Sequence, residues 1–214
     1  KGVNGNQNDT SVYSAGAVYV FTRPSVTGNW TQQAYVKAST PQAAAEFGHV
    51  VALSADGNTM AVSAYFEASK ATGINGDEAD TSIPQAGAVY VFTRTGTAWK
   101  QQAYIKASNT GEAGTADSFG DGDQFGFSLS LSDDGNTLAV GANAEDSNAT
   151  GINGNQQDNS MQSAGAVYVF TRAGTAWSQQ AYVKAANTLP NVQFGYSVAL
   201  SADGNTLAAS AFDE

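Results

Sequence analysis

The sequence predicts an all-β fold built from repeated four-stranded antiparallel sheets. The segment Ala-Gly-Ala-Val-Tyr-Val-Phe-Thr-Arg occurs three times, beginning at Ala15, Ala86 and Ala164, and such self-similarity sets the architecture of a chain. Apolar residues occupy both faces of the strand-like segments, and no helical period is present. An Asp-Gly-Asn-Thr turn recurs between two of these segments, which is a strong hairpin signal because Gly tolerates positive φ.

Four strands follow one another in each unit. The first opens at Phe-Gly and alternates two apolar sets over 47–53, and the second, 61–64, consists of small residues that suit a crowded site. The third strand, 17–22 in its first occurrence, places Val and Thr on one face and Ala, Tyr and Phe on the other. The fourth, 32–38, carries more polar residues, as expected of an outer, partly solvated strand.

Four antiparallel strands in a unit of about 70 residues, with both faces of the sheet covered, describe the blade of a β-propeller. An all-β solenoid is the alternative, but the hairpin and the long loop between the second and third strands favour blades. Residues 1–214 then form one propeller or part of one. We expect a half blade of third and fourth strands, two complete blades, and a half blade of first and second strands, over approximately 1–46, 47–124, 125–193 and 194–214.

Because a propeller needs at least about four blades to close, these three blade-equivalents require further blades from a parent chain or from another copy. The net charge of −10 argues against binding to nucleic acid or anionic membranes. The absence of cysteine excludes disulfides and thiolate catalysis. No apolar run of about 18 residues is present, so we expect no membrane span.

At its Phe-Gly, Asp134–Ala142 and Gly-Ala-Val-Tyr-Val-Phe motifs, the chain resembles the FG-GAP repeats of the integrin α-subunit propeller and of bacterial secreted or surface proteins. The Ala-Thr-Gly-Ile-Asn-Gly loops at 71–76 and 149–154 resemble the bacterial variety. The resemblance implies an extracellular or cell-surface propeller, commonly seven-bladed, that serves adhesion or ligand binding and often binds calcium. The link at 54–59 departs from the integrin pattern, because it has too few carboxylates for the 6–8 oxygens that calcium typically takes.

The loops between second and third strands are better calcium candidates. Each alternates Asn and Asp around a Gly turn, and a Glu occupies one shared position before each full loop, with Glu214 as its third occurrence. Calcium prefers such hard oxygen ligands, although these side chains could instead organise turns through local backbone bonds. The candidate ligands are Asn4, Asn6, Asp9, Glu67, Asn75, Asp77, Asp80, Glu145, Asn153, Asn155 and Asp158.

A second acidic segment occurs in one unit only and contains Asp117, Asp121 and Asp123. It is either a second candidate metal site or a flexible insert. The single histidine, His49, stands where the other units have Phe127 and Tyr196, so we expect it to pack as a ring. The repeated tryptophans could stack on sugars or pack between blades, and their repetition favours packing; they are Trp30, Trp99 and Trp177.

The preferred function is a binding and adhesion scaffold that holds a protein or carbohydrate ligand on its loop faces, because function concentrates in variable loops on a rigid frame. The alternative is an oligomeric structural subunit that assembles into rings or filaments through complementary half blades. A carbohydrate-cleaving enzyme has no support beyond the abundance of carboxylates, so we expect no catalytic activity.

Overall fold

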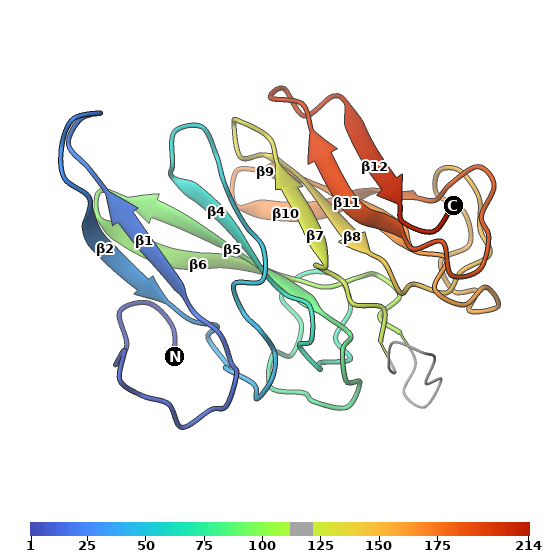
Figure 1. The fold of residues 1–214 in the computed structure, drawn as a ribbon, viewed down its shortest axis with the longest axis horizontal. Helices are drawn as coiled ribbons and strands as arrows, with labels where there is room; N and C mark the ends of the chain where they lie inside the picture. The colour runs from blue at the N-terminus through green and yellow to red at the C-terminus, as the bar shows by residue number, and fades with distance from the viewer. Residues whose placement is uncertain (112–121) are drawn as a thin grey trace.

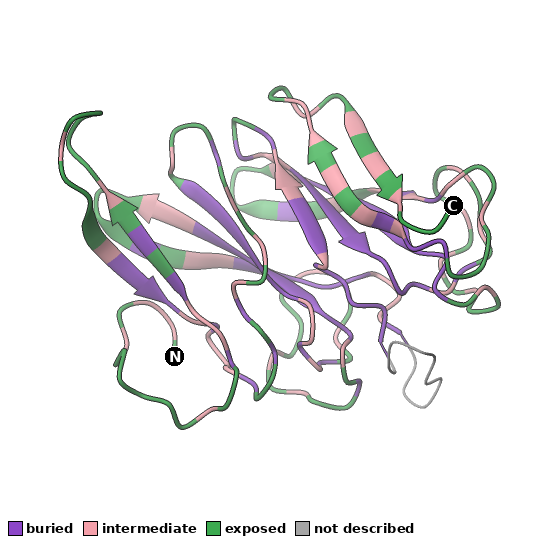
Figure 2. Cartoon of the chain, viewed as in Figure 1, coloured by how far each residue is buried: buried purple, intermediate pink, exposed green. Residues whose placement is uncertain are grey.

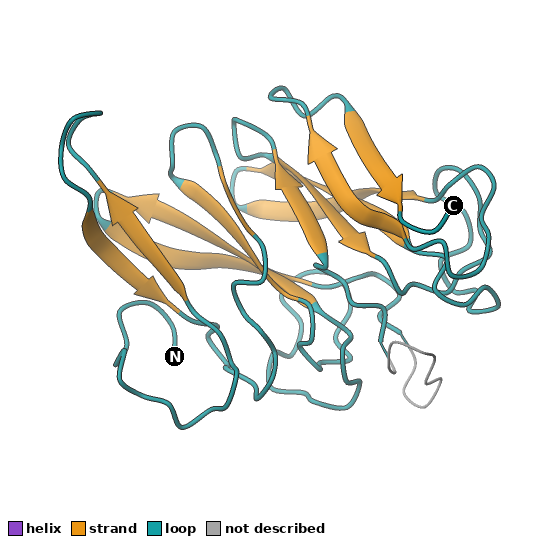
Figure 3. Ribbon diagram, in the orientation of Figure 1, coloured by secondary structure: helices purple, strands orange, loops and turns teal. Residues whose placement is uncertain are grey.

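The computed structural model describes residues 1–111 and 122–214, and within them every regular element is a β-strand (Figure 3). The strands are β1 Val18–Thr22, β2 Thr31–Val36, β3 Val51–Leu53, β4 Thr59–Ala64, β5 Ala88–Thr95, β6 Ala98–Ile105, β7 Ser128–Leu131, β8 Thr137–Ala142, β9 Ala166–Ala173, β10 Ala176–Val183, β11 Phe194–Leu200 and β12 Leu207–Ala211. No described segment forms a helix long and apolar enough to cross a bilayer.

The strands form four antiparallel sheets that lie side by side in an open row (Figure 1). The two inner sheets have the orders β3-β4-β5-β6 and β7-β8-β9-β10, and the two-stranded sheets β1-β2 and β11-β12 lie at opposite ends. This confirms the predicted all-β, blade-like architecture. Within the described residues the row does not close into a barrel.

The register is the same in both complete blades, since Thr59 opposes Thr93 in one and Thr137 opposes Thr171 in the other. The hairpin between first and second strands turns where sequence analysis predicted it, with Gly57 at a φ of 65°. The repeated sequence therefore produces a repeated backbone.

The core consists of two layers of side chains between successive sheets. One layer joins Val18 and Val20 of β1 to Tyr90 and Phe92 of β5. The other joins the opposite face of β5 to the sheet β7-β8-β9-β10 and to Phe125, which precedes β7. Figure 2 shows the result: the central strands are largely buried, β1 alternates between buried and exposed residues, and β11 and β12 alternate mostly between intermediate and exposed residues.

The Phe of each Phe-Gly motif lies directly against the glycine of the preceding Ala-Gly-Ala segment. A Cβ on Gly87 would lie 2.1 Å from the carbonyl oxygen of Phe125, and one on Gly165 would lie 2.1 Å from that of Phe194. Both glycines also have positive φ values of 80° and 76°. Only glycine fits these crossings, which is why the third strand always begins Ala-Gly-Ala.

Candidate functional site

The predicted calcium loops are organised by their own Asn and Asp side chains. Asn75 has a φ of 58°, donates its backbone N–H to the carbonyl of Tyr104 at 2.7 Å and accepts the Tyr104 N–H at 3.0 Å through Oδ1. Asn153 repeats these bonds with Tyr182, and Asn4 repeats them with Tyr35. Each Asn therefore fastens its loop to an outer strand.

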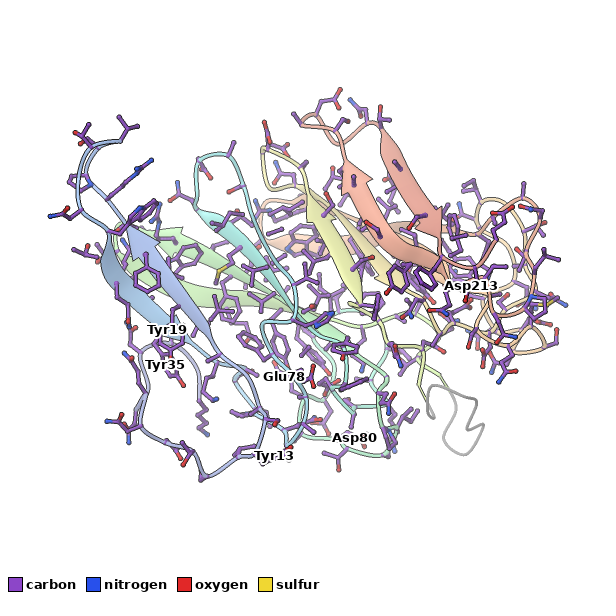
Figure 4. The ribbon with its side chains drawn as sticks, in the orientation of Figure 1. Tyr13, Tyr19, Tyr35, Glu78, Asp80 and Asp213 are labelled. Carbon is purple, nitrogen blue, oxygen red and sulfur yellow. The ribbon has the colours of Figure 1, made fainter. Side chains whose placement is uncertain are left out.

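The aspartates of these loops accept local N–H and O–H groups. Oδ1 of Asp80 accepts the N–H groups of Lys70 and Ser82 and the Ser82 hydroxyl at 2.9, 3.0 and 2.6 Å, and the loop lies at the lower edge of the molecule in Figure 4. These bonds, with that of Lys70 first, hold the pKa of Asp80 well below its usual range. Asp158 has the same three kinds of partner and a lowered pKa.

The remaining loop candidates make shorter local turns. Asp77 accepts the N–H of Ala79 at 2.9 Å, and Asn155 accepts that of Gln157 at 3.1 Å. In the N-terminal loop, the side chains of Asn6 and Asp9 each accept the backbone N–H of the residue two positions ahead, at 3.0 Å.

The glutamates that share one repeat position in the two complete blades lie in the interior rather than on the loop surface. Glu67 accepts the Lys106 ammonium at 2.8 Å, and Glu145 accepts that of Lys184 at 2.7 Å, with both pairs almost fully buried. Burial lowers the pKa of each lysine, and the adjacent glutamate opposes that effect. An amide completes each cluster, donated by Gln42 to Glu67 at 2.7 Å and by Asn109 to Glu145 at 3.1 Å.

The third glutamate of the series, Glu214, is exposed and accepts only the amide of Asn187, at 2.6 Å, among the contacts of the described residues. A spacing of 39 residues separates Glu from Lys in both buried pairs. That constant spacing is the sequence signal from which these ion pairs could have been predicted. Sequence analysis did not identify the lysines as partners of the glutamates.

These positions do not bring calcium ligands together. Within residues 1–111 and 122–214, no group of three or more His, Cys, Asp or Glu side chains converges as a metal site would require. The carboxylates point toward N–H groups, and two of the glutamates neutralise lysines. Calcium binding by these loops therefore stays a prediction.

The second acidic segment is described only in part. Asp117 and Asp121 lie outside the described residues, whereas Asp123 is buried. Burial, followed by the charges of Glu145 and Asp146, raises the pKa of Asp123 well above its usual value. No metal assignment follows from this one carboxyl.

A chain of aromatic rings crosses three sheets near the start of the first strands. His49 lies 4.1 Å from Tyr65 and 5.7 Å from Phe127, and Phe127 lies 4.9 Å from Tyr196, between ring centroids. One further ring extends the chain at each end, Phe66 beside Tyr65 and Phe212 beside Tyr196. We call the whole set the aromatic row; its members are His49, Tyr65, Phe66, Phe127, Tyr196 and Phe212. The expectation that His49 packs as a ring is confirmed.

The aromatic row remains partly open to solvent. His49 is exposed, Phe127 and Tyr196 are half-buried, and Phe212 is 60% exposed. Burial, followed by the charge of Glu46, raises the pKa of Tyr65 to about 12. Such a surface can stack flat apolar faces of a ligand. Sequence analysis missed Tyr65, Phe66 and Phe212 as members.

The repeated tryptophans of the complete blades pack between sheets, as predicted. Trp99 and Trp177 are each 6% exposed. Trp99 donates to Gln33 of the preceding sheet at 3.1 Å, and Trp177 donates to Gln102 at 3.1 Å. Trp30, which directly precedes β2 in the sheet at the end of the row, is 60% exposed and does not follow that expectation.

A family model described as an FG-GAP repeat matches residues 30–92, which run from the first tryptophan through the first complete Phe-Gly and Asp-Gly-Asn-Thr motifs. The chain therefore contains an FG-GAP repeat over these residues. The same motifs and the same strand register recur in the following unit, outside the matched residues.

Other comparisons add little. No curated protein sequence matches the chain. A solved structure titled "Crystal Structure of Mitotic Checkpoint Complex" aligns with 99% of this chain and 91% of that chain, at 13% identity and a TM-score of 0.25. A similarity of that size carries no argument about this protein.

Proposed function

We propose that the protein is a non-catalytic binding and adhesion module that works outside the cell or at the cell surface. The aromatic row is the observation that carries the proposal. It is partly exposed, it spans three units, and its members differ from one unit to the next although the frame around them is repeated.

The frame and the row have different physical requirements. Buried Glu-Lys pairs and packed tryptophans occur at the same places in both complete blades, because packing demands them. The aromatic row carries His49 in one unit, Phe127 in the next and Tyr196 in the third. Unit-specific side chains on a rigid scaffold are typical of a ligand-contacting surface.

The ligand should offer a flat apolar face, either a sugar ring or an apolar segment of a protein. Binding is measured on a glycan array and on an array of immobilised peptides, which separates these two classes. The variants Phe127→Ala and Tyr196→Ala should weaken binding at least about five-fold, since each removes a stacking ring worth about 1 kcal/mol or more.

The matched control is Val26→Ala, because Val26 is 80% exposed and lies far along the chain from the aromatic row. It should leave binding unchanged. Melting curves of each variant verify that the fold is retained. Equal binding by the wild type and both aromatic variants would contradict the role of this surface, as would the absence of binding on both arrays.

A further inference from the structure

A lysine, a glutamate and an asparagine meet at the interior end of the second complete blade. Lys184 directly follows β10, Glu145 follows β8, and Asn109 follows β6 of the neighbouring sheet. Oε2 of Glu145 accepts the Lys184 ammonium at 2.7 Å, and Oε1 accepts Nδ2 of Asn109 at 3.1 Å. One carboxyl group therefore contacts both an amine and a carboxamide.

The carbonyl of the same carboxamide has a donor of its own. The Tyr168 hydroxyl of β9 donates to Oδ1 of Asn109 at 2.5 Å. Burial raises the pKa of Tyr168 well above its usual value, so the phenol keeps its proton and acts as a donor. A donor at this oxygen stabilises the negative charge that develops when a nucleophile attacks the amide carbon.

We propose that Nζ of Lys184 attacks Cγ of Asn109 in the folded protein and forms an amide bond between the two side chains. The bond that forms is Nζ–Cγ, and the bond that breaks is Cγ–Nδ2. The Asn109 nitrogen leaves as ammonia. One amide replaces another, so the reaction needs no oxidant, reductant or co-reactant, and the ion pair with Glu145 is the arrangement that precedes it.

Glu145 is placed to carry the protons. Transfer of a proton from Nζ of Lys184 to Oε2 along the 2.7 Å bond leaves a neutral amine, which is the nucleophilic form, and a neutral carboxyl. The carboxyl then protonates the leaving Nδ2 of Asn109 and takes a second proton from Nζ, so Glu145 ends protonated and uncharged.

The surroundings favour these neutral forms. Lys184 is 3% exposed and Glu145 is 0% exposed, and burial disfavours charged groups. Burial lowers the pKa of Lys184, and the charges of Glu145 and Asp123 oppose that effect only in part. The same burial keeps bulk water away from the carboxyl and the amine, so hydrolysis of the amide does not compete with attack by Nζ.

Neighbouring groups hold the reactants in place. The Tyr182 hydroxyl donates to Oε1 of Glu145 at 2.6 Å, and the Ser147 N–H donates to Oε2 at 3.2 Å. Nδ2 of Asn109 also donates to the carbonyl of Gln156 at 2.6 Å. Groups fixed together in one site react as though they were at very high concentration, which makes a normally slow exchange of amides feasible.

The corresponding cluster of the first complete blade is held differently. Lys106 and Gln42 contact Glu67 at 2.8 and 2.7 Å. The Gln42 carbonyl accepts the backbone N–H of Ala68 at 2.8 Å, and its Nε2 donates to two backbone carbonyls as well as to Glu67. An amide nitrogen with three acceptors is held more firmly in place. The reaction is therefore assigned to Asn109, and Gln42 provides a matched control.

The bond would tether two adjacent sheets. Asn109 follows the outer strand of β3-β4-β5-β6, and Lys184 follows the outer strand of β7-β8-β9-β10 (Figure 1). A covalent link between distant residues restricts the unfolded chain, as a disulfide does. The chain has no cysteine, so an amide link would supply a constraint that disulfides cannot supply here. The reaction involves no ligand and is independent of what the aromatic row binds.

The test is mass spectrometry of the wild-type chain after incubation in the folded state at neutral pH. Its mass should be lower than that of the sequence by one ammonia. Trypsin cleaves the denatured chain after Lys106 and Arg172, with no Lys or Arg between them, and it would not cleave after an acylated Lys184. Fragments 107–172 and 173–214 should therefore remain covalently joined.

Three results would overturn the proposal. The first is a wild-type mass equal to that of the sequence after prolonged incubation. The second is loss of ammonia with the two fragments separate, because succinimide formation at an Asn-Gly step such as Asn75-Gly76 releases ammonia without a link. The third is equal formation of the link in a chain kept unfolded in urea, because the reacting groups meet only in the fold.

Variants identify the role of each group. Asn109→Ala and Lys184→Arg should abolish the link, and the latter keeps a cation opposite Glu145. Glu145→Gln should slow its formation at least about 100-fold by removing the proton carrier. Tyr168→Phe should slow it about 100-fold by removing the carbonyl donor. Gln42→Ala, at the matched amide of the first complete blade, should form the link like wild type.

A link in Asn109→Ala or Lys184→Arg would refute the assignment of the bonded atoms, and equal rates for wild type and Glu145→Gln would refute the role of the carboxyl. Melting curves establish which variants fold. The wild-type mass and its linked fragments decide the proposal without any substitution, so a variant that fails to fold does not affect the outcome. Binding through the aromatic row is measured separately, and its absence would leave this result unchanged.

Discussion

Replacement of Phe125 by alanine should destabilise the protein by about 3–5 kcal/mol. Phe125 is 0% exposed, and its ring meets the rings of Tyr168 and Phe170 edge-on at centroid distances of 5.4 and 6.0 Å. Burial of a phenylalanine side chain contributes about 1.5–3 kcal/mol, and each aromatic contact adds about 0.5–1.5 kcal/mol. Both neighbouring rings are themselves fully buried, so the substitution leaves a cavity into which the surroundings relax only partially.

The repeats provide matched controls for this substitution. Phe47→Ala removes an equivalent ring that is 2% exposed and should cost a similar amount. Phe194→Ala removes a half-buried ring and should cost only about 1–2 kcal/mol in the monomer. Urea unfolding at low protein concentration, followed through the buried Trp99 and Trp177, measures all three. An equal loss at Phe125 and Phe194 would refute the claim that sheet packing, rather than local sequence, determines the cost.

Three further predictions concern charged groups. Lys184→Met should lower the free energy of unfolding by about 3–5 kcal/mol, because it leaves Glu145 without its cation in the interior. Lys70→Met, at an exposed pair, is the control, and similar urea midpoints for the two variants would contradict the burial argument. Hydrogen bonds from Ser54 and Asn58 lower the pKa of Asp56 to about 2, so this carboxylate stabilises the fold above pH 4, and that contribution is lost as the pH falls from about 4 to 2. An Asp56→Asn variant should therefore have a shallower decline in melting temperature over that interval, and an unaltered slope would argue against it. If the loops bind calcium, the melting temperature should be higher in millimolar calcium than in chelator, by mass action. An unchanged melting temperature, together with no effect of Asp80→Ala on it, would rule this out.

Repetition in the sequence was sufficient to predict the strands, their order and their division between complete and half sheets. The Phe-Gly, Asp-Gly-Asn-Thr and Ala-Gly-Ala motifs are local signals, because each depends on backbone conformations that Gly or Asx residues permit. Trp99 and Trp177 were also predictable as packing residues, since a side chain that recurs at one strand position serves the frame.

The tertiary structure alone decided which groups the acidic residues contact. The same Asn and Asp pattern is compatible with calcium ligands and with turns, and only the positions of N–H groups around Asp80 distinguish between local bonding and an open ligand set. The partner of Glu145 is 39 residues away, and the rings of the aromatic row come from three units. Burial and pairing depend on segments distant in sequence, so local pattern determines the strands of this protein, whereas stacking of the sheets determines which charges are neutralised and which rings remain open.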